Sequence, residues 1–148
     1  MADAMSWTQK YFKVTTTIDI ATLTGAICVA LGSSYGGLFA NDDIHAKNLI
    51  NAGNEYFEQH WRMPICPKVA KTMIGTLSDL INHGKTLGGG AIQSATFLEN
   101  FVQKGLKWAY LNIASMMVAE TRDGMYDFGS RGFGCATMIH FVKHMANN

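Results

Sequence analysis

The chain has 148 residues, of which 48% are hydrophobic and 16% are charged, and its formal net charge at pH 7 is +1. This composition is typical of a globular protein and excludes an intrinsically disordered chain. We therefore expect residues 1–148 to form a single domain. The twelve basic residues form no block, which argues against nucleic-acid binding. No apolar run approaches the roughly 18 residues of a membrane-spanning helix, and the first residues lack a signal-peptide pattern.

Cysteine usage indicates a reducing environment. The three cysteines, Cys28, Cys66 and Cys135, are odd in number and widely spaced, which excludes a CxxC motif and argues against a disulfide framework. We therefore expect a cytoplasmic protein. Cys66 and Cys135 are predicted to be small core residues, because the sequence suggests no base or histidine to accompany them.

The first residues predict a helix that leads into a strand. Residues 2–12 have a helical pattern, and Thr and Ile alternate over residues 14–21 in the manner of a buried strand. The strand breaks at a small-residue turn, residues 24–25, and a helix-like run follows over 26–31. A strand that ends in such a turn is a common ligand site in α/β proteins, so this stretch is a predicted pocket wall. The expected core contacts of the first helix are Ala4, Met5, Tyr11 and Phe12.

The middle of the chain predicts a short strand and a capped helix. Residues 38–40 form the strand, and Asp42 and Asp43 suit the start of a helix that runs to about residue 59. Both prolines of the chain fall in residues 61–67, which we expect to be an extended connector. The residues expected on the buried side of the helix are Ile44, Leu49, Ile50, Tyr56 and Phe57.

The second half predicts further helices and one more strand. Residues 91–103 form the clearest amphipathic helix, and residues 108–114 are predicted to be a buried strand. Residues 68–75 predict a short helix, while residues 82–90 and 121–134 predict loops. The last helix spans residues 135–146, with an expected buried face of Cys135, Met138, Ile139, Val142 and Met145.

This alternation of strands and helices defines the predicted fold class. It indicates an α/β protein with a mostly parallel sheet covered on both faces. Only three strands are evident, which is few for an independent domain of this class. We therefore expect a partial α/β/α sandwich, with a mostly parallel or mixed sheet flanked by helices, that belongs to a larger protein.

Two short motifs suggest ligand sites but match them poorly. The stretch 84–86 (Gly-Lys-Thr) resembles the end of a phosphate-binding loop, but Asp79 replaces the glycine that opens such a loop. His140 and His144 stand one helical turn apart and suit a shared zinc ion, but the zinc-peptidase pattern requires Glu where this chain has Phe141. We therefore favour a solvent-exposed loop and solvent-exposed histidines.

The methionines and the acidic residues were considered for an apolar pocket and for a metal site. Met116 and Met117 suit either an apolar pocket or the core, and the pattern alone favours the core. No cluster of Asp, Glu and His that would hold a metal is evident. The acidic residues at a helix start or in a loop, where charge is usually solvated, are Asp42, Asp43, Asp123 and Asp127.

Several stretches stand in the order and spacing of one enzyme family. The blocks are 19–26 (Asp-Ile-Ala-Thr-Leu-Thr-Gly-Ala), 37–42 (Gly-Leu-Phe-Ala-Asn-Asp), 61–64 (Trp-Arg-Met-Pro), 78–82 (Ser-Asp-Leu-Ile-Asn), 88–92 (Gly-Gly-Gly-Ala-Ile) with 97–98 (Phe-Leu), 108–114 (Trp-Ala-Tyr-Leu-Asn-Ile-Ala) and 132–134 (Gly-Phe-Gly). On these blocks the chain resembles the C-terminal part of a leucine aminopeptidase (cytosol aminopeptidase), a family of two-metal peptidases that remove N-terminal residues from peptides. The resemblance covers essentially the whole chain.

The resemblance implies a fold, an assembly and a metal chemistry. The family has an α/β/α catalytic domain behind a smaller N-terminal domain and assembles as a homo-hexamer. Paired Zn²⁺ or Mn²⁺ ions activate a water and polarise the scissile carbonyl. Their ligands are a lysine and several carboxylates, two of which lie in an Asn-Thr-Asp-Ala-Glu-Gly-Arg motif whose arginine helps to position the catalytic anion.

The place of that motif decides what this chain is expected to lack. In the family it lies a few residues before the Ala-Asp-Ala that this chain carries at residues 2–4. The metal ligands and the catalytic arginine therefore fall outside the sequence. We expect no catalytic residue, no metal ligand and no bound metal in this chain.

The resemblance carries over residues on the substrate side only. By the match, Thr22, Leu23 and Gly25 line the site, where the Leu23 carbonyl and the Gly25 N–H hold the peptide. Ala114 and Met117 line the pocket for the first side chain of the peptide. For Met117 the resemblance therefore favours a pocket wall over the core.

Two departures from the family pattern fall on this side of the site. Asn112 stands where the family usually has Asp, which removes a possible charge-assisted hydrogen bond. Ser115 stands where the family usually has Gly, and we expect it to crowd the pocket slightly. The expected function is that of the C-terminal portion of a leucine aminopeptidase, inactive alone. The alternative is a non-catalytic interaction subunit that uses the oligomer surfaces of the family or complements a separate N-terminal piece.

Overall fold

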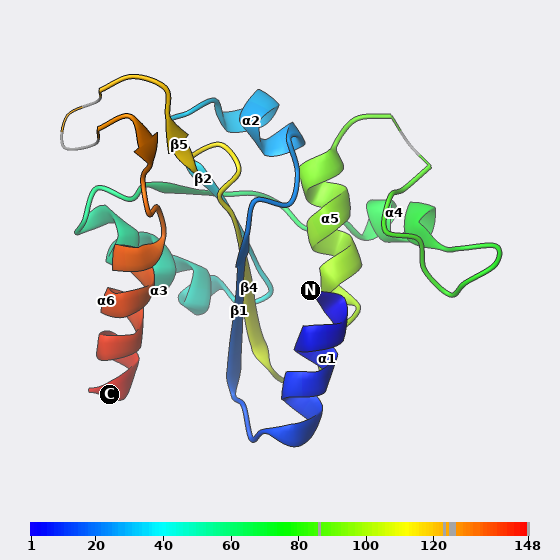
Figure 1. Ribbon diagram of the computed structural model, residues 1–148. Helices are drawn as coiled ribbons and strands as arrows, with labels where there is room; N and C mark the ends of the chain where they lie inside the picture. The colour runs from blue at the N-terminus through cyan, green and yellow to red at the C-terminus, as the bar shows by residue number, and fades with distance from the viewer. Residues whose placement is uncertain (86, 123, 125–126, 148) are drawn as a thin grey trace.

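The computed structural model describes residues 1–85, 87–122, 124 and 127–147 (Figure 1). Helices and strands alternate along most of the chain, as the sequence predicts. The helices are α1 (Ala2–Tyr11), α2 (Ala26–Leu31), α3 (Asp43–Asn54), α4 (Pro67–Ala70), α5 (Gly90–Glu99) and α6 (Cys135–Ala146), and a 3-10 turn spans Lys71–Met73. The strands are β1 (Thr16–Ala21), β2 (Gly36–Ala40), β3 (His60–Arg62), β4 (Lys107–Asn112), β5 (Val118–Ala119) and β6 (Gly129–Ser130).

Four strands form the main sheet in the order β1-β4-β2-β3. β1 runs parallel to β4 and β3 runs parallel to β2, while β2 and β4 are antiparallel, so the sheet is mixed. The α/β class is confirmed. The expectation of three strands is wrong, because β3 lies in the segment expected to be a connector and ends at Arg62, just before Pro64. β1 is a half-buried edge strand, not the buried strand that its alternation predicted.

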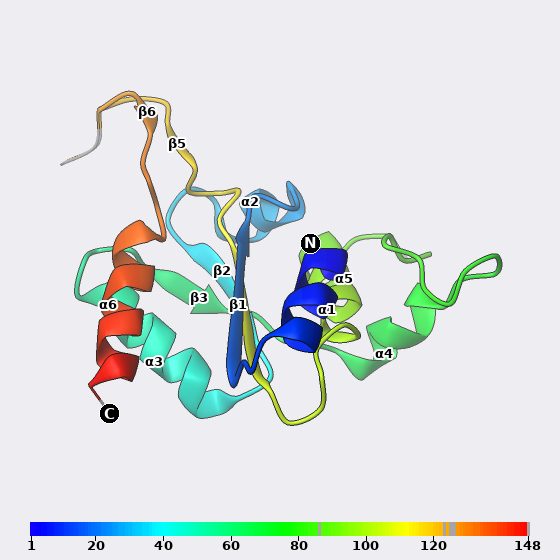
Figure 2. The same cartoon turned by 60° about the horizontal axis from the view of Figure 1, so that its bottom comes forward.

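Helices cover both faces of the sheet (Figures 1 and 2). α1, α2 and α5 lie on one face, and α3 and α6 lie on the other. β4 alternates its side chains between the two cores: Trp108 and Tyr110 pack into the first, and Ala109 and Leu111 pack into the second. All four side chains are completely buried, which confirms the predicted buried strand.

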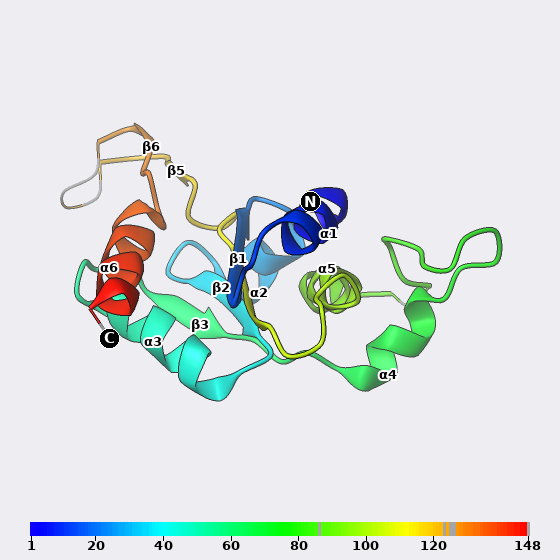
Figure 3. The same ribbon diagram turned by 90° about the horizontal axis from the view of Figure 1, so that it is seen from below.

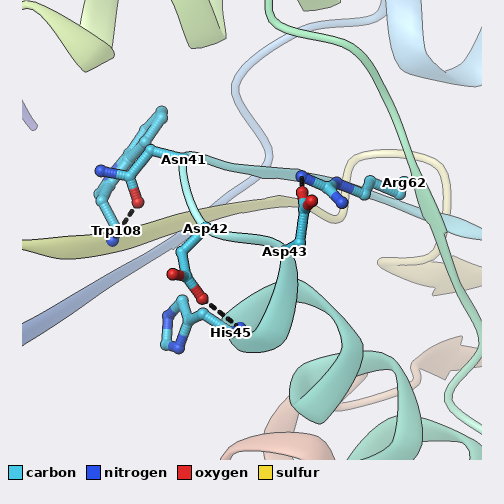
Figure 4. A network of polar contacts seen from close by, with 6 residues as sticks. All are labelled: Asn41, Asp42, Asp43, His45, Arg62 and Trp108. Atoms are coloured by element: carbon cyan, nitrogen blue, oxygen red, sulfur yellow. Dashed lines mark hydrogen bonds and ion pairs between the residues drawn. The ribbon is translucent and has the colours of Figure 1, made fainter.

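α3 begins where the sequence predicts but ends earlier. Asp42 caps the helix by accepting a hydrogen bond from the His45 N–H at 2.7 Å (Figure 4). The chain turns away soon after the helix, and Phe57 takes a left-handed backbone conformation (φ 59°). Leu49 is buried and Ile50 is half-buried, as expected. The residues that are exposed, against expectation, are Ile44, Tyr56 and Phe57.

α6 has the predicted bounds but buries a different face. Its buried residues are Thr137 and Phe141, while Met138 is half-buried. The Thr137 N–H and hydroxyl donate to the Glu58 carboxylate at 2.7 and 2.6 Å, and this buried pairing fixes which side of the helix faces inward. The predicted core role of Cys135 is therefore wrong. The expected buried residues that are exposed are Cys135, Ile139, Val142 and Met145.

α1 matches the predicted helix, but a glutamine holds it in place. Gln9 is only 5% exposed, and its Nε2 donates to the carbonyls of Met5 and Phe101, both at 2.9 Å. Its Oε1 accepts a hydrogen bond from the Gln103 N–H at 2.7 Å. These contacts lie beyond α5, which ends at Glu99 and not at residue 103. Met5 is buried as expected, while the other expected contacts are exposed: Ala4, Tyr11 and Phe12.

The remaining segments differ from expectation in smaller ways. In the described part of the loop 121–134, Gly129–Ser130 pairs with Val118–Ala119 as a short two-stranded ladder. Met116 is buried, as the core interpretation expects, whereas Met117 is 47% exposed. Within the described residues, no helix is long and apolar enough to cross a membrane.

Candidate functional site

The ends of β1 and β4 meet at one edge of the sheet. The two strands are parallel and in register to their last residues, Ala21 and Asn112, and the Ile113 N–H donates to the Ala21 carbonyl at 3.0 Å. The segments 22–25 and 113–117 therefore leave the sheet side by side. These segments contain all five residues that the resemblance places at the site: Thr22, Leu23, Gly25, Ala114 and Met117.

Asn112 joins the two segments. It is completely buried, its Nδ2 donates to Thr24 Oγ1 at 2.7 Å, and its Oδ1 accepts from the Ala114 N–H at 3.4 Å. A neutral amide suits this place because it supplies both a donor and an acceptor without burying a charge. Asn112, which stands where the family usually has Asp, thus holds the turn after β1 through hydrogen bonds between uncharged groups.

The turn after β1 presents unbonded backbone groups. Leu23 is 45% exposed, and within the described residues neither its carbonyl nor the Gly25 N–H is bonded to another protein group. Gly25 is the N-cap of α2, and a Cβ placed on it would meet no atom within 4 Å. The space around Gly25 is therefore open to the backbone of a ligand.

Two cavities flank this turn and divide the predicted site residues. Leu23 lines a cavity of about 690 Å³ on the α5 side. Ala114 and Met117 line a second cavity of about 540 Å³, beside α2 and β5. Thr22 and Gly25 line neither of these two cavities. The five residues therefore share a sheet edge but do not line one pocket.

Gln93 is a lining residue of the first cavity that the sequence analysis missed. It is 2% exposed, its Nε2 donates to the Gly88 carbonyl at 2.6 Å, and its Oε1 accepts from the Gly84 N–H at 2.8 Å. The feature of the sequence that could have indicated this role is that Gln93 is a polar residue within the predicted amphipathic helix, residues 91–103. Because the Gly84 N–H is engaged, it cannot cradle a phosphate, which argues against a nucleotide site here. Thr86 of that motif lies outside the described residues.

The second cavity is lined by polar as well as apolar side chains. Ser115 is 9% exposed, and its hydroxyl donates to the Tyr35 carbonyl at 2.8 Å, so this side chain is held against the loop before β2. Glu120, Arg122 and Arg131 line the same cavity. The cavity beside Ala114 and Met117 therefore combines apolar and charged surfaces.

One carboxylate lies within β1 itself. Asp19 accepts a hydrogen bond from Trp108 Nε1 at 2.7 Å. Burial raises the pKa of Asp19 above its usual value, and the hydrogen bond from Trp108 acts in the opposite direction. Burial also raises the pKa of Tyr110 above its usual value.

The described residues do not fit the two-metal centre that the resemblance implies. Among them, no group of three or more His, Cys, Asp and Glu side chains could hold a metal ion. His140, which we weighed as a zinc ligand, instead pairs with Glu55, with Nε2 and Oε2 2.8 Å apart. Its ring also packs on Tyr56, with centroids 5.4 Å apart. Asp43 accepts a hydrogen bond from Arg62 Nη2 at 2.7 Å (Figure 4).

Comparison with known proteins decides the family. A model of the catalytic domain of the cytosol aminopeptidase family matches residues 1–139. The chain belongs to the cytosol aminopeptidase family. The resemblance found in the sequence is thereby confirmed.

Curated relatives extend well beyond the matched segment. The probable cytosol aminopeptidases of Rickettsia felis and of Chlamydia trachomatis serovar L2 are each 38% identical to this chain over 144 residues. The match covers 97% of this chain but 29% of each relative. The chain therefore spans less than a third of the length of these cytosol aminopeptidases.

Solved structures of similar proteins share the fold. The bottromycin maturation enzyme BotP superposes with a TM-score of 0.90 at 29% identity, covering 99% of this chain and 32% of BotP. A mutant of tomato leucine aminopeptidase gives a TM-score of 0.87 at 34% identity, covering 97% of this chain and 27% of that protein. BotP in complex with Mn gives a TM-score of 0.91 at 28% identity, covering 98% of this chain and 32% of that chain. These similarities confirm the expected fold, part of an α/β catalytic domain.

Proposed function

We propose that this chain forms the peptide-binding wall of an aminopeptidase active site and does not hydrolyse peptides on its own. The wall consists of Thr22, Leu23, Gly25, Ala114 and Met117. One observation carries the proposal. The turn after β1, whose Leu23 carbonyl and Gly25 N–H have no hydrogen-bond partner among the described residues, meets the segment after β4 at one edge of the sheet.

An extended peptide is the ligand that suits these groups. The Leu23 carbonyl accepts from a peptide N–H and the Gly25 N–H donates to a peptide carbonyl, as in other backbone-directed modes of peptide recognition. Thr22 borders the same path. Ala114 and Met117 contact the first side chain of the peptide, for which a small methyl group and an adaptable thioether provide an apolar surface.

The residues of this chain bind and orient the peptide but do not supply the hydrolytic step. In metal-dependent peptidases a bound metal pair activates water and polarises the carbonyl. The described residues offer no cluster of ligands for such a pair. We therefore expect no cleavage of a leucine anilide in the presence of Mn²⁺ or Zn²⁺. Turnover above a metal-free blank would refute this part of the proposal.

A peptide titration tests the wall directly. With leucyl-glycine as the probe, we expect NMR shift changes concentrated in residues 22–26 and 113–117. Gly25→Ala adds a methyl group that meets no protein atom within 4 Å, so it should leave the melting temperature unchanged. The methyl group occupies the open space beside the Gly25 N–H and hinders the approach of a peptide carbonyl, so it should weaken peptide binding about fivefold, which corresponds to about 1 kcal/mol.

Val29→Ala is the matched control for this titration. Val29 lies on the same short helix, α2, and is 90% exposed, so its truncation should change neither folding nor binding. Equal affinities of the wild-type chain and Gly25→Ala would contradict the assignment of the Gly25 N–H to the peptide.

A non-catalytic interaction subunit is the second candidate function, and an exposed aromatic cluster at the C-terminal end of α1 favours it. Trp7, Tyr11 and Phe12 are 57%, 61% and 57% exposed, and the Trp7 ring lies 5.2 and 5.6 Å from the other two ring centroids. Exposed apolar clusters often mark protein interfaces. Light scattering on the chain mixed with an intact cytosol aminopeptidase tests this function. A mixed oligomer, such as a hexamer, supports it, and separate species argue against it.

A further inference from the structure

The second cavity offers a peptide side chain more than an apolar surface. Its volume is about 540 Å³, within the range of sites that hold whole small ligands, about 300–1,000 Å³. Ala114 and Met117 supply only part of its lining. The lining residues with polar or charged side chains are Ser33, Ser115, Glu120, Thr121, Arg122 and Arg131. An apolar side chain that contacts Ala114 and Met117 therefore leaves the polar part of this cavity without a partner from the peptide.

The β5–β6 ladder places Arg131 opposite Met117. The two strands are antiparallel, with Val118 opposite Ser130, and the Arg131 N–H donates to the Met117 carbonyl at 3.2 Å. Met117 and Arg131 are therefore the next pair of the ladder. Side chains of such a pair lie on the same face, with Cβ atoms about 4.5–5.5 Å apart, and both residues line the cavity. A guanidinium group thus belongs to the same wall as the thioether that we propose contacts the first side chain.

The segment that carries Met117 to this ladder is anchored to the rest of the fold. The ladder lies outside the main sheet, on the side of the molecule where α6 lies (Figure 3). The Ser115 hydroxyl donates to the Tyr35 carbonyl at 2.8 Å, and Met116 is only 6% exposed. The position of Met117, and with it that of Arg131, is therefore fixed relative to the end of β4.

Positive charges outnumber negative charges around the cavity. Arg122 and Arg131 carry the positive charges, and Glu120 carries the negative one. Glu120 and Arg122 are exposed, and Arg131 is half-buried. A guanidinium group presents five N–H donors in a planar fork, so it can bond a carboxylate while another of its N–H groups contacts a neighbour. The charge of the cavity therefore suits an anionic side chain.

We infer, building on the proposed function, that this cavity selects peptides whose first residue is acidic, and that Arg122 and Arg131 determine this specificity. The methylene groups of a glutamyl side chain contact Ala114 and Met117, and its carboxylate accepts hydrogen bonds from the guanidinium groups. A leucyl side chain makes only the apolar contacts. A polar site discriminates against a side chain that cannot bond its polar groups, so leucyl peptides bind less tightly.

A matched set of dipeptides tests the inference. Glutamyl-glycine, glutaminyl-glycine and leucyl-glycine share a backbone and a terminal carboxylate, so only the first side chain differs. In NMR titrations of the wild-type chain we expect glutamyl-glycine to bind about fivefold more tightly than glutaminyl-glycine, as for a partly exposed ion pair. This advantage should shrink in about 1 M sodium chloride, because salt screens such a pair. Equal affinities for the two peptides would overturn the inference.

Charge variants should change the preference in opposite directions. Arg122→Gln should reduce the advantage of glutamyl-glycine, whereas Glu120→Gln should increase it, because that variant removes a like charge from the cavity. Arg122→Glu leaves more negative than positive charge and should make lysyl-glycine bind more tightly than glutamyl-glycine. Both positions are exposed, so these variants should fold normally. A purely structural role of Arg122 would not reverse the preference.

Lys104→Gln is the matched control, because it also removes one positive charge from an exposed position. Lys104 precedes β4, whereas the cavity adjoins the segment after β4, so this variant should leave the preference unchanged. Arg131→Gln should act like Arg122→Gln. Circular dichroism checks that each variant folds, and if Arg131→Gln does not fold, the exposed Arg122 variants decide alone. A wild-type preference in Arg122→Gln and Arg122→Glu would overturn the inference.

Leucyl-glycine separates this inference from the proposed function. If it binds while glutamyl-glycine and glutaminyl-glycine bind with equal affinity, the peptide-binding wall stands and the selection of acidic residues is refuted. If no dipeptide binds, the proposed function fails and the inference fails with it. If glutamyl-glycine binds more tightly than glutaminyl-glycine but Gly25→Ala leaves its affinity unchanged, the selection by the arginines stands and the assignment of the Gly25 N–H to the peptide is refuted.

Discussion

Acid is expected to destabilise the protein through His60. This side chain is 4% exposed, its Nε2 lies 3.1 Å from Thr137 Oγ1, and among the described residues its buried Nδ1 has no hydrogen-bond partner. Burial lowers the pKa of His60 from 6.5 to about 4, although the nearby Glu58 carboxylate acts in the opposite direction. The folded protein therefore keeps this imidazole neutral where the unfolded chain would protonate it.

The sign and size of the effect follow from this difference in pKa. Between pH 6.5 and about 4 the unfolded chain binds a proton that the folded chain does not, so stability falls as the pH is lowered. The contribution is fully present above the unfolded pKa and is lost as the pH falls toward the folded pKa. A pKa difference of about 2.5 corresponds to about 3 kcal/mol when both states are protonated. A domain has a total stability of roughly 5–15 kcal/mol, so the loss is substantial.

Urea unfolding at pH 7 and pH 4.5, followed by circular dichroism, measures this loss. The comparison protein is His60→Gln, which keeps a polar group opposite Thr137 but does not titrate. We expect the free energy of unfolding to fall by about 2 kcal/mol more in the wild-type chain than in the variant over this range. Burial also lowers the pKa of His45, but His45 titrates in both proteins and so cancels. Equal losses in the two proteins would refute the assignment to His60.

Three further substitutions test the packing. Trp108→Ala empties a completely buried site and should lower the free energy of unfolding by about 3–5 kcal/mol in urea; a loss below about 1 kcal/mol would contradict its core role. Thr137→Val deletes the hydroxyl that donates to Glu58 at 2.6 Å and should cost about 1–3 kcal/mol in the same assay, so unchanged stability would argue against that bond. Gly53→Ala sets a Cβ against the Glu58 carbonyl oxygen and should lower the melting temperature, whereas a melting temperature equal to that of Gly25→Ala would show that the backbone yields freely.

Local sequence patterns correctly predicted elements such as β4, whose own residue types indicate that the strand is buried. The apolar run of β4 was sufficient because that strand is covered on both faces. β3 was missed because three residues beside two prolines carry no usable periodicity. α6 shows where local patterns fail. Its apolar pattern predicted that another face would be buried, but Thr137 is buried because its hydrogen-bond partner is Glu58, which is far away in sequence.

The candidate site was predictable only in part. The residue types of the turn after β1 marked it as a pocket wall, but its link to Ala114 and Met117 came from the family resemblance. Asn112 and Thr24 are 88 residues apart in sequence, so nothing local indicates that they bond. The same holds for the two separate cavities, because their walls come from segments that only the folded chain brings together.

β1 is synthesised well before β4, the strand with which it pairs. Among the described strands it pairs only with β4, and α1 is tied by Gln9 to the carbonyl of Phe101, 92 residues further along the chain. At a translation rate of roughly 5–20 residues per second, α1 and β1 leave the ribosome several seconds before the segments that hold them. During that interval β1 lacks its β4 partner and can pair with other nascent chains. A chaperone that binds β1 would therefore protect this sheet until β4 has been synthesised.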